Sequence, residues 1–108
     1  MQQLTGSQDV FRAIADPTRR AVLVKLRHRE YSMTDLAGDY AGSQPTFSKH
    51  VRVLIASGLV AQRRQGKQLM CRLNPDALTD IVGWADLFRD LWLERLNALD
   101  QFLENKHG

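Results

Sequence analysis

Residues 43–52 combine amide, hydroxyl, imidazole and cationic side chains within a short stretch of chain. Amide and hydroxyl groups hydrogen-bond the edges of bases, whereas lysine and arginine neutralise phosphates. No aspartate or glutamate occurs from Ser43 through Arg72, and this absence points to an anionic partner more strongly than any single cation does. The residues that we expect to contact DNA from this segment are Ser43, Gln44, Thr46, Ser48, Lys49, His50 and Arg52.

Further cations lie in two other places along the chain. Arg63, Arg64 and Lys67 surround a loop glycine, and long cationic side chains on a protruding loop reach phosphates or the minor groove. Arg19 and Arg20 are expected to hold the DNA backbone. Each cation alone is equally compatible with a solvated surface charge, but the whole set together favours double-stranded DNA as the partner.

The remaining reactive residues do not form the patterns that enzymes or metal sites need. There is no nucleophile motif and no phosphate-binding glycine loop, so we expect no enzyme. His28 and His50 are isolated in the sequence from other metal ligands, which predicts neither a metal site nor a cofactor. The single cysteine, Cys71, is expected to be a small buried strand residue, because a redox switch needs an exposed thiol and usually a second cysteine.

A helix must position the polar residues of segment 43–52. Phe47, Val51 and Leu54 recur at helical spacing, and Ser43 is a predicted N-terminal cap. Burial of this apolar stripe turns the opposite side of the helix to solvent. The outward positions are then Pro45, Thr46, Lys49, Arg52 and Ala56.

Three shorter helices are predicted before this one. The first covers residues 8–15, with Ser7 as its cap, and the second covers residues 17–28, with Asp16 as its cap and proline at its first position. The sequence Ser32-Met33-Thr34-Asp35 has the form of a capping box and opens a short third helix.

Two short segments after these helices predict a β-hairpin. Strands are expected over residues 59–64 and 68–73, joined by the glycine-containing turn 65–67. The order helix, turn, helix, hairpin is that of a winged helix-turn-helix, in which the second helix of the pair enters the major groove. We therefore predict a mainly α fold with a small β-hairpin and about five helices, in a single DNA-binding domain over residues 1–108.

The pair Asn74-Pro75 predicts the start of a long C-terminal helix over residues 75–105. Its apolar residues spread over an arc wider than one stripe. A monomer leaves part of this arc exposed, and large exposed apolar patches mark interfaces. We expect a homodimer built on this helix; the alternative is a helix that its own domain covers completely.

Composition sets the outer limits of these predictions. A chain of 108 residues with 44% apolar and 25% charged residues is typical of one globular domain. Residues 1–75 hold 12 basic and 5 acidic residues, whereas residues 76–108 hold 3 and 7. The absence of a signal peptide and of a membrane-spanning stretch predicts a soluble, cytoplasmic protein without a membrane partner. The alternative function is a winged-helix module whose basic surface binds an acidic protein.

Several spaced motifs resemble those of the ArsR-type winged helix-turn-helix transcriptional repressors. The segment Phe11–Arg20 is similar to the family's opening signature, and Ser43–Val51 is similar to its recognition helix. Leu54, Gly58–Val60 and Arg63–Lys67 fit its wing. The resemblance covers nearly the whole chain and implies a homodimer that binds an inverted-repeat operator and represses transcription.

The resemblance also implies roles for individual residues. Gln44, Thr46, Ser48 and His50 would approach bases, and the wing cations would touch the DNA backbone. The first and last helices of two subunits would pack together. The residues expected in this dimer interface are Val10, Phe11, Ile14, Trp84, Phe88, Leu91, Trp92 and Leu99.

The sequence departs from the family in several respects. The position before Ser43 is usually a bulky aliphatic residue, but here it is Gly42, which predicts a less firmly anchored recognition helix. Many relatives sense metals through paired cysteines or histidine–aspartate clusters, whereas the third helix here contains no cysteine. We therefore expect a member of the family without metal sensing.

Overall fold

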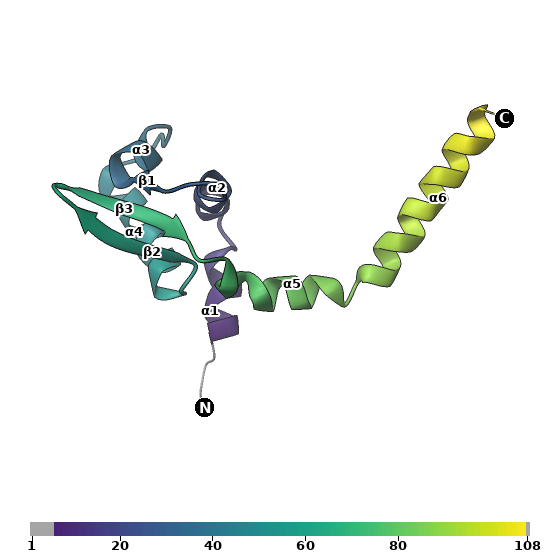
Figure 1. The fold of residues 1–108 in the computed structure, drawn as a ribbon, viewed down its shortest axis with the longest axis horizontal. Coiled ribbons are helices and arrows are strands. Elements are labelled where there is room, and N and C mark those ends of the chain that lie inside the picture. The colour runs from purple at the N-terminus through teal and green to yellow at the C-terminus, as the bar shows by residue number, and fades with distance from the viewer. Residues whose placement is uncertain (1–5, 108) are drawn as a thin grey trace.

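The computed structural model describes the backbone of residues 6–107 and the side chains of residues 10–105. Within this part, helices pack on a small antiparallel sheet, and a long arm leaves the main body at its C-terminal end (Figure 1). The elements are α1 (Gly6–Ala13), α2 (Pro17–Lys25), β1 (Tyr31–Ser32), α3 (Met33–Ala37), α4 (Gln44–Ala56), β2 (Val60–Gln65), β3 (Gln68–Leu73), the 3₁₀-helix η1 (Pro75–Leu78), α5 (Thr79–Asp86) and α6 (Arg89–His107). The predicted class, a mainly α winged helix-turn-helix, is confirmed.

Side-chain caps begin three helices at the predicted residues. Asp16 Oδ2 accepts a hydrogen bond of 3.1 Å from the backbone N–H of Arg19 at the start of α2. Ser32 Oγ accepts one of 3.1 Å from the backbone N–H of Asp35 at the start of α3. Ser43 caps α4 in the same way. Each cap satisfies a backbone donor that the first helical turn leaves unpaired.

The ends of the first two helices differ from the prediction. Helix α1 already begins at Gly6, so Ser7 lies within its first turn and is not its cap. Helix α2 ends at Lys25, three residues before the predicted end. Leu26 is its C-terminal cap, and the Leu26 backbone N–H donates to the carbonyl of Val22.

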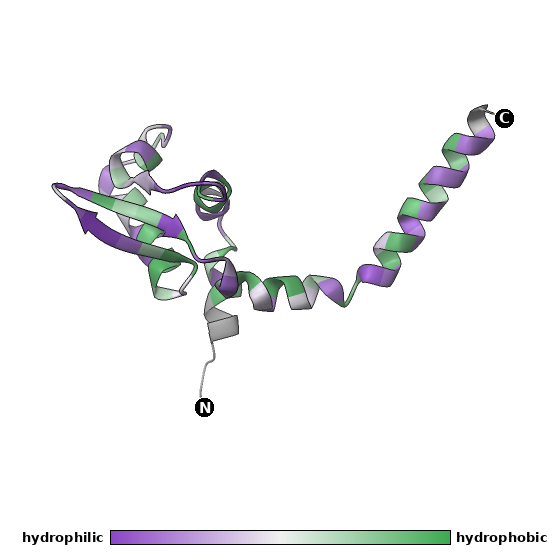
Figure 2. Cartoon of the chain, in the orientation of Figure 1, coloured by the Kyte–Doolittle hydropathy of each residue, from purple (hydrophilic) through white to green (hydrophobic). Residues whose placement is uncertain are grey.

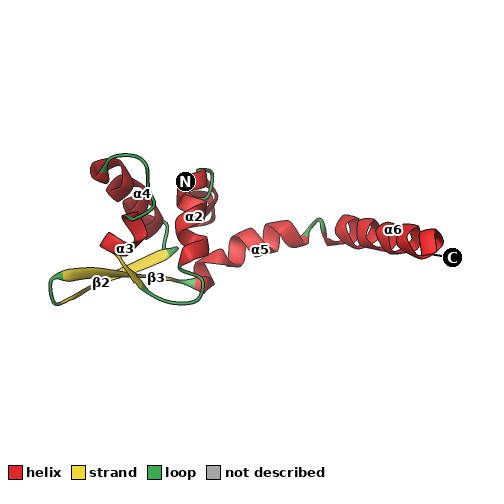
Figure 3. Cartoon of the chain, turned by 90° about the horizontal axis from the view of Figure 1, so that it is seen from above, coloured by secondary structure: helices red, strands yellow, loops and turns green. Residues whose placement is uncertain are grey.

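The sheet has three strands in the order β1-β3-β2, and both pairings are antiparallel. Strands β2 and β3 form the predicted hairpin, whose last pair is Gln65 with Gln68. Gly66 in the turn has a φ of 61°, a left-handed conformation that glycine adopts without a steric penalty. The main-body helices lie on one side of this sheet (Figure 3). Strand β1 is too short for an alternating pattern to reveal it.

The hydrophobic core joins the helices of the main body to the sheet. Leu54, Leu59 and Cys71 are completely buried, and burial of one large aliphatic side chain stabilises the fold by roughly 1.5–3 kcal/mol. This core therefore fixes which side of α4 faces inward. The buried hydrophobic residues are Val10, Ala13, Val22, Leu23, Leu26, Leu36, Phe47, Val51, Leu54, Leu59, Val60 and Cys71.

The single long helix predicted over residues 75–105 is wrong. The segment divides into η1, α5 and α6, and residues 87–88 separate the last two helices. At the break, the backbone N–H groups of Leu87 and Phe88 bond to carbonyls three residues earlier, so the turn tightens and the helix axis changes direction. The side chain of Asn74 donates to the carbonyl of Gly58 at 3.1 Å and makes no cap.

Helix α6 extends away from the main body and carries hydrophobic residues along its length (Figure 2). Its large hydrophobic side chains are exposed. None of the helices described is long and apolar enough to cross a membrane.

Candidate nucleic-acid interface

Helix α4 turns its apolar stripe inward and its cations outward, as its spacing predicts. Phe47 and Val51 are 3% and 1% exposed, respectively, and both belong to the core. Lys49 and Arg52 lie on the opposite side, are exposed, and form neither an ion pair nor a side-chain hydrogen bond with any residue whose side chain is described. Both cations are therefore available to an external anion.

The N-terminal turn of α4 brings together four of the predicted polar residues. Gln44 and Ser48 line a small cavity of about 200 Å³, which they share with Leu69 of the wing. The Ser43 hydroxyl donates to Thr46 Oγ1 at 3.0 Å, so the cap residue also orients the threonine hydroxyl. Amide and hydroxyl groups thus gather where a recognition helix meets base edges.

His50 lies on the flank of α4 that faces the junction of α1 and α2. Its Nδ1 is 3.1 Å from Arg19 Nη1 and 3.7 Å from Asp16 Oδ2. Because a guanidinium has no acceptor, Nδ1 must accept this hydrogen bond, and the neutral ring then carries its proton on Nε2. Sequence spacing alone did not reveal these two partners of His50.

Tyr40 corrects the expectation that Gly42 weakens the anchoring of α4. A Cβ atom at Gly42 would lie only 2.6 Å from the Tyr40 ring, which occupies the space that a larger residue would fill. The ring centroid of Tyr40 is 5.3 Å from that of Phe47 and 6.3 Å from that of His50, both on α4. The aromatic ring anchors the helix instead of a side chain at position 42.

The wing cations fall into two groups. Successive residues of a strand point to opposite faces, and in the hairpin Arg63 pairs with Met70 whereas Arg64 pairs with Leu69. Arg63 donates to both carboxylate oxygens of Glu30, at 2.6 and 3.3 Å. Arg64 and Lys67 are exposed and have no such partner among the described side chains.

Arg19 and Arg20, which are expected to hold the DNA backbone, both bind carbonyls of their own chain. Arg19 Nε donates to the carbonyl of Ala13 at 2.6 Å, and Arg20 Nη1 donates to that of Ile14 at 2.9 Å. Both guanidinium groups therefore cap the C-terminal end of α1, where free carbonyls favour cations.

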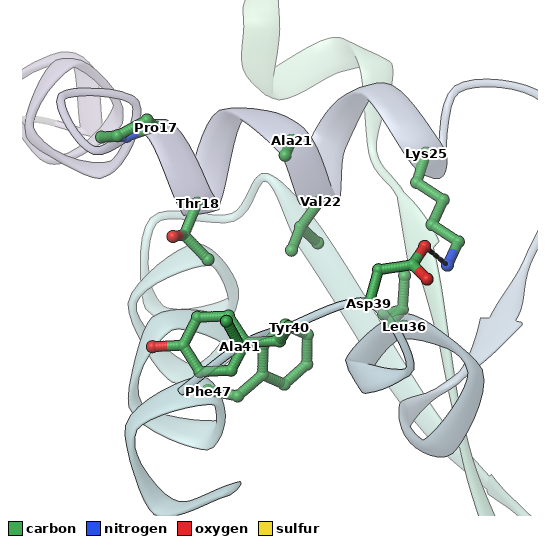
Figure 4. A pocket seen from close by; sticks show the side chains of 10 residues that line it. All are labelled: Pro17, Thr18, Ala21, Val22, Lys25, Leu36, Asp39, Tyr40, Ala41 and Phe47. Carbon is green, nitrogen blue, oxygen red and sulfur yellow. Dashed lines mark ion pairs between the residues drawn. The ribbon is translucent and has the colours of Figure 1, made fainter. Parts of the chain in front are cut away.

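A groove of about 530 Å³ separates α2 from α3 and the start of α4. Thr18 and Val22 of α2 point into it from one side, and Tyr40 and Phe47 lie on the other (Figure 4). At one end, Lys25 Nζ lies 3.8 Å from Oδ2 of Asp39, which follows α3. The groove is therefore bordered by Tyr40 and Phe47, whose ring contact anchors α4.

Cys71 is completely buried on β3, as the sequence predicted. Its sulfur accepts a hydrogen bond from Gln62 Nε2 at 3.6 Å and contacts Met33 Sδ at 3.5 Å. Burial raises the pKa of the Cys71 thiol, which keeps the group in its unreactive protonated form. Among the residues described, no three histidine, cysteine or acidic side chains come together as metal ligands would.

The residues expected in a dimer interface divide into core and surface. Val10 is 3% exposed and belongs to the protomer's own core, so its assignment to the interface is wrong. Phe11 contacts Trp84 edge-on, with ring centroids 5.9 Å apart, and thereby joins α1 to α5. Ile14 is half-buried, packed against the core. The exposed members of the set are Trp84, Phe88, Leu91, Trp92 and Leu99.

Comparisons with known proteins agree on one family. The family model described as "Bacterial regulatory protein, arsR family" matches residues 16–62. The chain is 33% identical to the transcriptional repressor SdpR of Bacillus subtilis, over 70% of this chain and 84% of that protein. It is 31% identical to the HTH-type transcriptional regulator Rv2034 of Mycobacterium tuberculosis, over 89% and 87%.

Solved structures give the same result. The fold is similar to the crystal structure of an ArsR family transcriptional regulator, with a TM-score of 0.73 and 32% identity over 82% of this chain and 97% of that one. An ArsR-like transcriptional regulator from Rhodococcus sp. RHA1 gives a TM-score of 0.65 and 28% identity, over 90% and 92%.

Proposed function

Since the chain belongs to the ArsR family of bacterial regulatory proteins, we propose that it represses transcription by binding an inverted-repeat operator as a homodimer. The relatives are DNA-binding transcriptional regulators and not enzymes. A regulator of this kind acts on chromosomal DNA, so the proposal includes a cytoplasmic location. The single domain of residues 1–108 then has a DNA-reading body and a C-terminal arm for assembly.

The observation that carries the proposal is the outer side of α4. It presents exposed cations that form no ion pair with any described side chain, and the segment from Ser43 through Arg72 contains no carboxylate. In this proposal Gln44, Thr46 and Ser48 contact base edges, and the Nε2 proton of His50 remains free to join them. Ser43 orders Thr46. The phosphate contacts come from Lys49, Arg52, Arg64 and Lys67.

The homodimer rests on the exposed apolar surface of α5 and α6. Trp92 is 67% exposed and Leu91 is 58% exposed, and no element that the structure describes covers them. Pairing of two copies by a two-fold axis buries this surface. It also presents two copies of α4 to successive major grooves, about 34 Å apart.

The proposed repressor does not sense metals through its own ligands. Cys71 is the single cysteine, and its sulfur is buried against Met33. His50 already binds Arg19. Titration of the protein with Zn²⁺ in a calorimeter should give no tight stoichiometric binding, and a stoichiometric transition would contradict this part of the proposal.

DNA binding is tested with a duplex obtained by selecting bound sequences from a random library. The parent protein should prefer this duplex to a scrambled one of equal length, and binding should weaken as salt rises. Gln44→Ala should reduce the preference for the selected duplex, whereas Lys49→Ala should weaken binding to both duplexes. If neither duplex binds in a salt-dependent way, the proposed function is wrong.

A further inference from the structure

Arg19 occupies a position between two elements that have separate tasks. Its Nε donates to the carbonyl of Ala13 at 2.6 Å, and its Nη2 donates to that of Arg12 at 3.3 Å, both at the end of α1. Its Nη1 donates to His50 Nδ1 on α4 at 3.1 Å. All three nitrogens of the guanidinium therefore have protein partners. These bonds use three of its five N–H donors and hold the guanidinium between α1 and α4.

Both ends of this connection lead to surfaces with a proposed role. On α1, Phe11 precedes the carbonyls that Arg19 binds, and its ring contacts Trp84 of the exposed apolar surface. On α4, His50 is in the middle of the recognition helix and contacts Tyr40. Asp16 helps to place Arg19 at the start of α2, because its carboxylate accepts from the Arg19 backbone N–H at 3.1 Å.

We propose that Arg19 is a positioning residue for DNA recognition: it fixes α4 relative to the end of α1 through His50 and makes no phosphate contact of its own. This inference rests on the proposed function, because it assumes that α4 reads DNA. It assigns to Arg19 a role in sequence preference, whereas a phosphate contact contributes equally to every sequence. The same bonds join α1, whose Phe11 contacts Trp84 of α5, to the recognition helix α4.

The first test measures binding of Arg19→Ala to the selected and the scrambled duplex over a range of salt concentrations. We expect the preference for the selected duplex to fall by about 2-fold to 30-fold, while the slope of log K against log salt stays at the parent value. If Arg19 instead neutralised a phosphate, its removal would lower that slope by about 0.9 and weaken both duplexes equally. That result would overturn the proposal.

Two matched variants sharpen this test. Arg19→Lys keeps the charge but loses the planar guanidinium that reaches both helices, so the preference should still fall. Arg20→Ala removes a neighbouring guanidinium bonded to the same end of α1 but not to α4, and the ratio of the two affinities should remain that of the parent. Full recovery by lysine, or an equal loss of preference in Arg20→Ala, would contradict the proposal.

The second test reads the His50 ring directly and does not depend on DNA. Nitrogen NMR of the full-length protein above the pH at which the ring is protonated should show His50 with an unprotonated Nδ1 and a protonated Nε2. Arg19→Ala should remove this preference for one tautomer. A parent ring protonated on Nδ1 would overturn the proposal even if the Arg19 variants fail to fold. Failure of the parent to bind DNA would overturn the proposed function and with it the role of Arg19 in recognition, but not the Arg19–His50 bond that the NMR experiment reads.

Discussion

Gly42 and Tyr40 share one space beside the recognition helix. The ring of Tyr40 lies where a side chain at position 42 would extend, and it packs against Phe47 and His50. The two positions therefore depend on each other. A larger residue at 42 is compatible with this arrangement only if the ring at 40 leaves.

Gly42→Ala should destabilise the protein by about 1–3 kcal/mol, because the added methyl group overlaps the Tyr40 ring and displaces it from α4. Urea unfolding followed by circular dichroism measures this change. The same substitution in a Tyr40→Ala background should cost much less, since the ring is then absent. Equal costs in both backgrounds would show that the two residues do not compete for space.

Asp16 gives the stability of the fold a dependence on pH. The backbone hydrogen bond from Arg19 lowers the pKa of Asp16, and His50 contributes in the same direction. A carboxyl with a lowered pKa in the folded state stabilises the protein above its unfolded pKa, and this stabilisation disappears as the pH falls through the folded value.

Asp16→Asn should therefore be less stable than the parent at neutral pH, and the difference should shrink between about pH 5 and pH 2. Asparagine still accepts the cap hydrogen bond, so the substitution removes the charge and keeps the helix start. Unfolding free energies measured across this range provide the check. Parallel stability curves for the two proteins would contradict the role of the charge.

Residue-level predictions from sequence succeed where the partners are close in the chain. The caps at Asp16, Ser32 and Ser43 each bind a backbone group three residues later, so a local pattern is sufficient to identify them. The partners of Arg19 and Arg63 lie 31 and 33 residues away. Because only folding brings such residues together, their cations could not be distinguished from free surface charges.

At the scale of elements, the hairpin separates cations that are adjacent in sequence. Arg63 and Arg64 point to opposite faces of β2, and Glu30 neutralises only the first of them. The basic wing predicted from composition is thus only partly available to DNA.

Arg64→Gln should lower the salt slope of DNA binding by about 0.9, the contribution of one neutralised phosphate, whereas Arg63→Gln should leave it close to that of the parent. Fluorescence anisotropy of a labelled duplex at several salt concentrations measures both slopes. Glu30→Gln serves as the matched control, because it releases Arg63 from its ion pair and should make binding tighter. A slope that falls as much for Arg63→Gln as for Arg64→Gln would reverse this assignment.

The order of the elements could be predicted, but not all of their lengths. Amphipathic spacing correctly identified α4, and the loop glycine identified the hairpin. The break at Leu87 and Phe88 contains neither proline nor glycine, the residues by which a sequence normally shows a helix interruption. Its apolar residues instead continued the helical pattern, so a single helix was expected.

At the scale of the whole molecule, α6 has an apolar side on which Leu91, Trp92 and Leu96 are more than half exposed. Most of the stability of a helix in a protein comes from packing of its apolar face, so packing against a second copy is expected to stabilise α6. Leu96 and Leu99 are 54% and 52% exposed and lie on the same apolar side.

Leu96→Lys combined with Leu99→Lys should convert the dimer into a monomer and weaken binding to the selected duplex. Sedimentation at micromolar concentration should give the parent twice the 12.3 kDa mass of one chain and the variant the mass of one chain. Gln101→Lys, which adds a charge to the opposite side of α6, should remain dimeric. A parent that sediments only as a monomer would contradict the proposed assembly.

The shape of the molecule also separates its charges along its longest dimension of 62 Å. The cations of α4 and the wing lie at one end, and the acidic residues of α5 and α6 extend toward the other (Figure 1). In the field of a duplex, this arrangement turns the basic end toward the phosphates before any contact forms. Productive encounters are then more frequent than random orientation allows, and the association rate should fall steeply as ionic strength increases.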